Sequence, residues 1–366
     1  MRPPFGQPIT AREIEAFTSR QDEVAFVRLA NAMLASAVAD VLPNAVLPAC
    51  SERVNVPDGG VDAELLLTAD TTLPEQHGLV GPGRAVYQFK WRDIAARKRT
   101  EILRQLTRSI TTELARLRVK AGPLPDRYVL LTNLDLTAAQ TRQLRRTILT
   151  GCPEFSEKPI AIWGAGEISA YLNIHPRVRH AFFSEGVFCT IEVAVQELKN
   201  QYRAFPWVEI RGRDPQIEAI REFASSGPER VLLVCGPSYV GKTRTVQEAL
   251  IPLGGRVVWA SHAEVVTEDH LRDLDHEMTT ILVLDDCERE TLERSIRWAM
   301  SRSNLKTILI GPQDSGWPGV SKLFIGPLED AEGSGLMRAI APGLPSLQES
   351  WPVSYTHLRA HETGRN

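Results

Sequence analysis

The chain has little cysteine, and it has no cysteine or histidine pattern of the kind that binds metal. Its five cysteines among 366 residues are scattered, and no two form a Cys-x-x-Cys pair. This odd, dispersed set excludes a disulfide-stabilised secreted scaffold and favours a reducing compartment, so we expect a cytoplasmic protein. The eight histidines form no His-x-x-x-His or Cys/His cluster, which excludes a zinc site of the usual spacing.

Long apolar runs are also missing. No stretch approaches 18 consecutive apolar residues, and residues 1–10 lack the apolar core of a signal peptide. We therefore expect no membrane partner. With 42 Lys and Arg against 45 Asp and Glu, the net charge is −3, which excludes a uniformly basic nucleic-acid coat. The composition is 43% hydrophobic, ordinary for a globular protein, and the length predicts two or three domains.

The near-neutral total hides an uneven distribution of charge. Residues 1–185 carry a net +3 and residues 186–366 a net −6. Residues 84–120 hold 11 basic residues against three acidic ones, and residues 264–293 hold 11 acidic residues against two basic ones. Two functional modules would explain this asymmetry, although solvated helix faces would also produce part of it.

The first half of the chain alternates between helical and strand patterns. Apolar residues at three- and four-residue steps predict helices over 22–41 and 94–118, and Thr137 is placed to cap a third helix that runs to Leu149. A short helix is predicted at 166–172. Short apolar or alternating runs predict four strands, at 61–67, 85–91, 128–132 and 160–163. This order indicates an α/β domain with a small mixed sheet.

The second half shows a different α/β pattern. Residues 186–206 carry few signals, and we predict a linker there. From Val231 onward, short buried strands alternate with helical stretches, which is typical of a parallel sheet. The predicted strands are 231–235, 257–260, 281–284 and 307–311.

A complete GxxxxGK(S/T) motif follows the first of these strands and precedes a helical stretch. Its residues are Gly236, Pro237, Ser238, Tyr239, Val240, Gly241, Lys242 and Thr243. In that setting the glycines let backbone N–H groups surround phosphate oxygens at a helix N-terminus. We predict that Lys242 contacts the β- and γ-phosphates of ATP or another nucleoside triphosphate, and that Thr243 ligates Mg²⁺. The alternative is an ordinary glycine-rich turn.

Two acidic residues follow the third predicted strand of this half. Asp285 stands 43 residues after Lys242, directly after four apolar residues, and Asp286 follows it. Such a strand end is typical of the acidic segment that completes a P-loop site. We predict that Asp285 holds Mg²⁺ through water and that Asp286 orients or deprotonates the attacking water. The alternative is a cap for the following helix.

Around this motif the chain resembles STAND-type NTPases, signalling ATPases related to AAA+ proteins. Gly212-Arg213 matches their glycine-arginine segment, and residues 328–331 (LEDA) resemble the turn that opens their helical lid. The resemblance covers about 205–345 and implies that Arg213 lies near the nucleotide. The chain departs from the family at residues 311–313 (GPQ), where a polar sensor segment ending in arginine is common. This departure leaves open whether the nucleotide is hydrolysed or only bound.

The first half contains a candidate site for phosphodiester hydrolysis. Asp62 and Glu64 lie on one predicted strand, and Gln88 and Lys90 lie on the next. Hydrolysis needs a carboxylate that fixes Mg²⁺ against the scissile phosphate and a lysine that steers water or stabilises charge. The alternative is a surface hairpin with an extended lysine side chain.

This arrangement resembles the PD-(D/E)xK nucleases, and most closely the Mrr-type restriction endonucleases, over about 20–183. The resemblance implies a metal site of Asp62 and Glu23, with Glu64 as a further ligand. It assigns catalytic roles to Asp62, Glu23, Gln88 and Lys90. Gln88 would support the site, and Lys90 would activate or orient water. The cationic stretch after Lys90 would follow a DNA backbone, or would form a solvated helix face; its members are Arg92, Arg97, Lys98, Arg99, Arg104 and Arg108.

The expected organisation is a nuclease domain (1–185), a linker (186–206) and an NTPase domain with an incomplete lid (207–351). Residues 352–366 resemble translated sequencing-adapter sequence, so we expect the natural chain to be longer. The resemblances imply bacterial anti-phage defence: a phage-derived trigger binds a missing C-terminal sensor, NTP binding drives homo-oligomerisation, and the nuclease cuts double-stranded DNA. One rival is a McrB-like restriction motor-nuclease. The other is a non-catalytic DNA- or partner-binding module fused to an NTPase switch.

Overall fold

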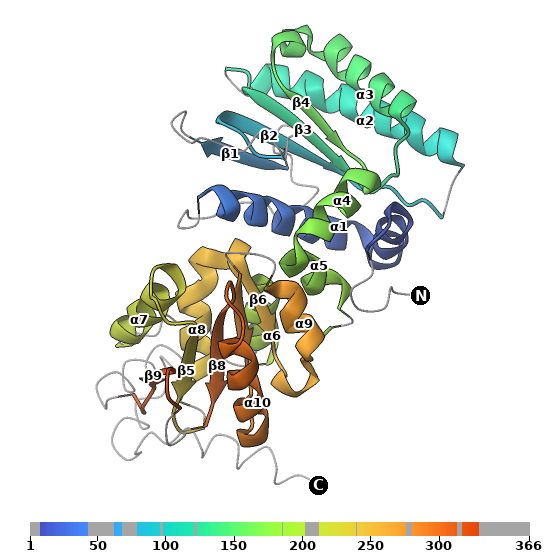
Figure 1. Ribbon diagram of the computed structural model, residues 1–366. Helices are drawn as coiled ribbons and strands as arrows, with labels where there is room; N and C mark the ends of the chain where they lie inside the picture. Colours follow the sequence, from blue (N-terminus) through green and yellow to red (C-terminus); the bar gives the residue numbers. More distant parts are fainter. Residues whose placement is uncertain are drawn as a thin grey trace, which may run out of the picture. The chain divides into compact units, whose positions relative to one another are not determined.

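The chain divides into two compact units, residues 1–179 and residues 180–366, in the computed structural model (Figure 1). The structure describes residues 8–42, 62–67, 79–95, 98–120, 123–184, 186–201, 212–238, 240–275, 280–312 and 317–328. The division falls at residue 179, whereas the sequence analysis placed it at 185. Helix α5 (Pro176–Phe183) spans the division.

The first unit is built on a four-stranded mixed sheet with the strand order β1-β2-β3-β4. The strands are β1 (Ala63–Leu67), β2 (Gly83–Lys90), β3 (Arg127–Thr132) and β4 (Ile160–Trp163). Strand β1 is antiparallel to β2, whereas β2, β3 and β4 are mutually parallel. The residue before β1 therefore lies beside the end of β2.

Helices cover both faces of this sheet (Figure 1). Helices α2 (Arg99–Lys120) and α3 (Ala138–Gly151) cover one face, and α1 (Ala11–Val41) and α4 (Ala165–Ile174) cover the other. The α2–α3 face is closed by apolar side chains from alternate strand positions and from the helices, among them Val86, Leu130, Ile162, Leu106 and Ile148. Thr137 caps α3 as predicted, since its hydroxyl accepts a hydrogen bond from the Gln140 N–H.

Helix α1 begins eleven residues before the predicted helix start, at Ala11 instead of residue 22. A capping box explains the difference: Thr10 accepts from the Glu13 N–H, and the Glu13 carboxylate accepts from the Thr10 N–H. Residues Glu23–Val41 have a mean hydropathy of 1.5 and are long enough to cross a membrane. Just over half of this stretch is buried within the protein, and a core helix satisfies the same criteria. The composition of α1 is thus weak support for a membrane span.

The second unit contains a five-stranded parallel sheet with the order β6-β7-β8-β5-β9. Four of its strands match the predictions within one residue: β5 (Val231–Cys235), β6 (Val257–Ala260), β7 (Ile281–Leu284) and β8 (Lys306–Gly311). The fifth, β9 (Ser321–Phe324), was not predicted, because it has neither an apolar run nor a fully buried residue. Strand β8 lies between β5 and β7. Because the three strands are parallel, their carboxyl ends lie at the same edge of the sheet.

Both faces of this sheet are covered. One face packs on α6 (Ile191–Gln201), α7 (Asp214–Ser225) and α8 (Lys242–Leu250). The other packs on α9 (Glu268–Leu274) and α10 (Arg289–Met300). Helix α6 lies in the segment that we predicted as a linker, and its buried Ile191, Ala194 and Val195 join the core.

The predicted fold class is confirmed. The protein is an α/β protein in which a mixed-sheet unit precedes a parallel-sheet unit of the P-loop NTPase type. Several sequence predictions fall outside the described residues: Tyr239, Arg97, the end of the lid turn (329–331), Gln313 and the tail at 352–366.

Candidate functional site

The glycine-rich loop leaves the carboxyl end of β5 and enters α8. Gly236 has φ 151°, and a Cβ atom there would lie 2.1 Å from the carbonyl oxygen of Ile325, so only glycine fits. Gly241 caps α8 in the left-handed region, with φ 87° and open space around it. Pro237 and Ser238 are exposed, and Val240 packs against the core. This is the geometry of a phosphate-binding P-loop.

Lys242 is folded back over its own loop. Its Nζ donates to the carbonyl oxygens of Gly236 at 3.1 Å and of Pro237 at 2.7 Å. Burial lowers the pKa of Lys242, and the nearby Asp285 opposes that effect. An ammonium group whose present partners are neutral carbonyls is well placed to exchange them for the charged oxygens of a phosphate.

The predicted magnesium ligands lie in direct contact. The Thr243 hydroxyl donates to Asp285 Oδ1 at 3.1 Å, although the two residues stand on α8 and at the end of β7. The Asp285 N–H donates to the carbonyl oxygen of Ala260, which extends the pairing of β6 with β7 and fixes the position of Asp285. One carboxylate, one hydroxyl and the oxygens of a bound phosphate are a donor set that suits Mg²⁺, so the residues present fit this ion.

Asp286 occupies an unusual backbone conformation next to this pair. Among the described residues that are not glycine, it alone has a positive φ, at 52°. Its N–H donates to Asp285 Oδ1 at 2.9 Å, and its side chain is exposed. Such conformations cost about 1–3 kcal/mol and cluster at functional sites, which agrees with the predicted role of this residue beside the phosphates.

Arg213 contacts the backbone of the P-loop. It is buried at the start of α7, and its Nη2 donates to the carbonyl oxygens of Gly326 at 2.6 Å and of Val240 at 3.4 Å. The guanidinium group therefore braces the P-loop backbone against the chain that leaves β9. Its role as a direct nucleotide contact stays a prediction.

Burial raises the pKa of Asp285 to about 6, against the hydrogen bonds from Asp286 and Thr243. Because the folded pKa is raised, the contribution of this group to stability is lost as the pH rises through 6. We expect Asp285→Asn to stabilise the nucleotide-free protein by about 1–3 kcal/mol at pH 8 and to have little effect at about pH 3.5, where the aspartate is largely protonated in the folded and the unfolded protein. Thermal unfolding at both pH values measures this. The same variant should weaken binding of Mg²⁺-nucleotide, and an equal gain in stability at both pH values would contradict the account.

The first unit brings Asp62 and Lys90 together, as the sequence predicted. Asp62 precedes β1, and its Oδ2 accepts from the Phe89 N–H at 2.6 Å and lies 3.5 Å from Lys90 Nζ. Lys90 is the last residue of β2 and is buried. The antiparallel pairing of β1 with β2 creates this contact, since the start of one strand meets the end of the other.

Glu113, which the sequence pattern did not identify, is closer to Lys90 than Asp62 is. Glu113 lies on α2, and its Oε2 is 2.7 Å from Lys90 Nζ. A signal was present: Glu113 lies three residues after Ile110 and four before Leu117, within the apolar stripe that faces the sheet. An acidic residue in a buried stripe needs a charged partner, and here that partner is the candidate lysine.

The other predicted residues of this site are arranged differently. Gln88 is fully buried, and its side-chain oxygen accepts from the Tyr128 hydroxyl. Glu64 is exposed and pairs with Arg84 at 2.5 Å. Glu23 lies on α1, on the opposite face of the sheet from α2 (Figure 1).

The predicted metal set of Asp62, Glu23 and Glu64 is therefore not assembled. Within the described ranges, no group of three or more His, Cys, Asp or Glu side chains is placed to hold a metal ion. Asp62 and Glu113 flank Lys90 and fit Mg²⁺ only with the help of substrate oxygens, because Mg²⁺ takes one or two protein carboxylates in such sites.

No family model matches the chain, and no curated protein matches it. Two similar solved structures are of NtrX from Brucella abortus. The structure in complex with ADP has a TM-score of 0.31 and 15% identity, over 75% of this chain and 70% of that chain. The structure in complex with ATP has a TM-score of 0.26 and 14% identity, over 61% of this chain and 54% of that chain. Similarity at this level carries no argument about function.

Proposed function

We propose that the second unit binds a nucleoside triphosphate together with Mg²⁺. The observation that supports this most directly is the contact of Thr243 on α8 with Asp285, directly after β7, beside the glycine loop and Lys242. Backbone N–H groups and Lys242 would hold the phosphates, and Thr243 and Asp285 would hold Mg²⁺. Mg²⁺, when bound, would neutralise phosphate charge. Asp286 would then orient water at the γ-phosphate.

Calorimetric titration with ATP and GTP in the presence of Mg²⁺ tests this proposal. We expect one nucleotide to bind per chain and the affinity to fall when EDTA removes Mg²⁺. A lack of binding by every common nucleoside triphosphate would contradict it.

We further propose that the first unit is a Mg²⁺-dependent DNA endonuclease that the nucleotide state controls. Its support is the placement of buried Lys90 beside Asp62 and Glu113 at the end of β2. Water would attack phosphorus, and the bond from phosphorus to the leaving oxygen would break. Lys90 would stabilise the charge that develops on the phosphoryl oxygens. Mg²⁺, held by Asp62, would act as a Lewis acid.

Incubation of supercoiled plasmid with the protein, Mg²⁺ and ATP tests the nuclease proposal. We expect nicked and linear products with Mg²⁺ and none with EDTA. The anti-phage role, the phage-derived trigger, the nucleotide-driven homo-oligomer and the cytoplasmic location rest on the family resemblances. ATPase stimulation by DNA alone, with no protein trigger, would favour the motor-nuclease instead.

A second candidate for the first unit is a non-catalytic nucleic-acid-binding module. The specific observation in its favour is that Lys90 is already paired with two carboxylates, Asp62 and Glu113. DNA binding with intact plasmid under every nucleotide condition would favour this candidate.

A further inference from the structure

Helices α2 and α3 each carry exposed arginines. The two helices are separated in the sequence, but they lie on the same side of the first unit. On α2, Arg104 and Arg108 are exposed and lie opposite the apolar stripe that faces the sheet. On α3, Arg142 and Arg146 are exposed and lie opposite buried Leu144 and Ile148. Because both helices pack on the same face of the sheet (Figure 1), all four arginines point away from that face. We call these four residues the α2–α3 cationic face.

The structure changes which cations of the basic stretch are available. Arg99 pairs with Glu15 at 3.1 Å, and Arg92 is partly buried and bonds to the Trp91 carbonyl. In contrast, none of the four arginines of the cationic face takes part in an ion pair within the described residues. The free positive charge therefore lies on the two outer helix surfaces.

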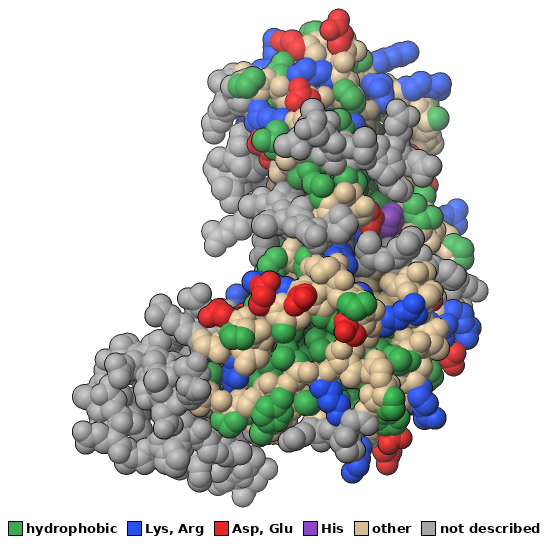
Figure 2. Space-filling model, turned by 60° about the vertical axis from the view of Figure 1, so that its left-hand side comes forward, with side chains coloured by type: hydrophobic (Ala, Val, Ile, Leu, Met, Phe, Trp, Pro, Cys, Tyr) green, Lys and Arg blue, Asp and Glu red, His purple; other side chains and the backbone are tan. Residues whose placement is uncertain are grey.

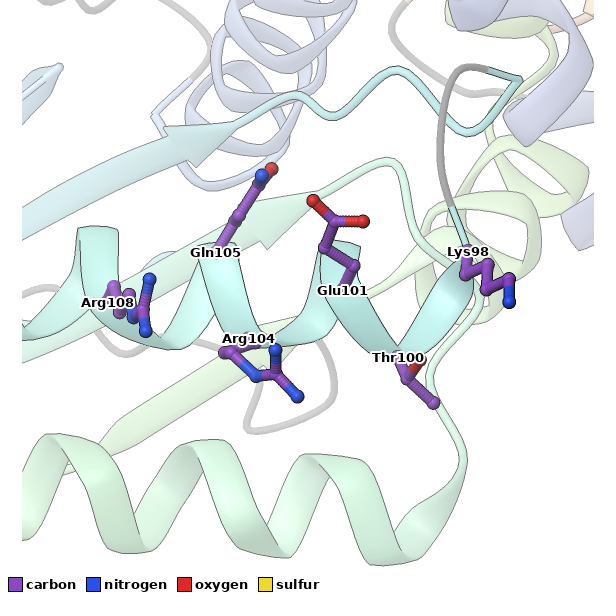
Figure 3. Close-up of a pocket in the computed structure, with 6 residues that line it drawn as sticks. All are labelled: Lys98, Thr100, Glu101, Arg104, Gln105 and Arg108. Carbon is purple, nitrogen blue, oxygen red and sulfur yellow. The ribbon is translucent and has the colours of Figure 1, made fainter.

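Acidic residues are nearly absent from this face. Helix α3 contains no Asp or Glu, and α2 contains only Glu101 and Glu113. Glu113 turns inward to Lys90, and Figure 3 shows Glu101 and Gln105 on the opposite side of α2 from Arg104, which is directed toward α3. A shallow hollow of about 300 Å³ lies along this part of α2 (Figure 3). It is lined by Lys98, Thr100, Glu101, Arg104, Gln105 and Arg108. On the face drawn in Figure 2, blue Lys and Arg side chains and a few red acidic ones lie on the upper part of the molecule.

Helices α8 and α9 of the second unit are built differently. There, arginines pair with acids of their own helix: Arg272 with Asp269 at 2.9 Å, and Arg244 with Glu248 at 2.9 Å. Such pairs are the ordinary way to solvate a charged helix face. Their absence on the described parts of α2 and α3 leaves an uncompensated positive field, which attracts a polyanion.

We propose that the α2–α3 cationic face binds the phosphate backbone of duplex DNA without regard to base sequence. The proposal deepens the nuclease function by naming the surface that holds its substrate. Neither helix contains an aromatic residue, so the stacking platform that single strands require is lacking on α2 and α3. Arginines at four-residue spacing on two neighbouring helices match repeated phosphate contacts, which set affinity and not specificity.

The test compares two double variants in EDTA, where no cleavage occurs. Arg142→Gln with Arg146→Gln removes two charges from α3. The matched control, Arg289→Gln with Arg297→Gln, removes two exposed charges from α10, which also carries acids. Fluorescence anisotropy with a labelled duplex of arbitrary sequence measures affinity as NaCl rises. We expect the α3 variant to lose about tenfold or more in affinity and its salt slope to fall by about two, with the control unchanged.

Unchanged binding by the α3 variant, an equal loss in the control, or tighter binding of single strands or duplex RNA would overturn the proposal. Arg104→Gln with Arg108→Gln should reproduce the loss, which guards against a folding defect in one variant. Cleavage is measured in parallel with Mg²⁺. Binding as expected but no cleavage by the native protein would contradict the nuclease function and leave this surface supported. Cleavage that the α3 variant retains in full would contradict this surface and leave the nuclease supported.

Discussion

Replacing Lys242 by alanine is expected to lower nucleotide affinity by about a hundredfold or more. The ammonium group lies over the P-loop and would form charge-assisted hydrogen bonds with phosphate oxygens, worth about 1.5–3 kcal/mol each. Calorimetric titration with Mg²⁺-ATP measures the loss.

The control for this variant is Arg297→Ala, which removes an exposed cation on α10 of the same unit. It should bind nucleotide as the native protein does. Lys242→Ala should remain folded, because the carbonyl groups that it leaves lie in a partly exposed loop, where water replaces hydrogen bonds worth about 0.5–1.5 kcal/mol each. Native-like affinity in a folded Lys242→Ala protein would refute the P-loop assignment.

Removing Lys90 is expected to lower DNA cleavage by about a hundredfold to ten-thousandfold, the range of a positioned charge or proton-transfer group. The single change Lys90→Ala also leaves the Asp62 and Glu113 carboxylates facing each other without a cation. Breaking a buried ion pair in this way costs about 3–5 kcal/mol, so the variant tests folding and chemistry together.

A second variant separates the two effects. Lys90→Met combined with Glu113→Gln removes one positive and one negative charge. The net charge of the three side chains stays at about −1, and Asp62 keeps its hydrogen bond from the Phe89 N–H. We expect the double variant to fold and to leave plasmid intact. Glu113→Gln alone keeps a hydrogen-bond acceptor for Lys90, and we expect reduced cleavage with a changed dependence on Mg²⁺ concentration.

Glu157→Gln provides the matched control, because Glu157 is an exposed acid of the same unit that lies between α3 and β4, away from Lys90 in the sequence. It should cleave plasmid like the native protein. Far-UV circular dichroism and thermal unfolding establish that each variant is folded. Full nuclease activity in the folded double variant would show that Lys90 and Glu113 take no part in cleavage.

The sequence by itself determined the local elements and one of the two candidate sites. The strands at 231–235, 257–260, 281–284 and 160–163 are runs of apolar residues, and burial on both faces is the one environment that suits such runs. The P-loop was equally visible, because its function needs contiguous residues: the glycines, Lys242 and Thr243 all lie in one short segment.

Tertiary structure alone decided the contacts between distant segments. Strand β8 lies between β5 and β7, and this order places Asp285 against Thr243. Helix α6 is held by packing against the core, and strand β9 is held by pairing with β5. Neither contact could be predicted from the residues of these segments alone. The early start of α1 depended on a cap formed by two polar side chains.

The candidate nuclease site shows the same limit most clearly. Sequence spacing predicted that Asp62 and Lys90 meet, because a hairpin between neighbouring strands follows from local pattern. It assigned Glu23 on α1 to this site and did not identify Glu113 on α2, since only packing decides which side chain of α1 or α2 reaches Lys90. Glu113 reaches Lys90, and the arginines of α3 lie beside those of α2, because both helices bury their apolar stripes against the same sheet face. Burial of apolar surface is non-directional, so the sequence determined which residues are buried and the completed fold determined their neighbours.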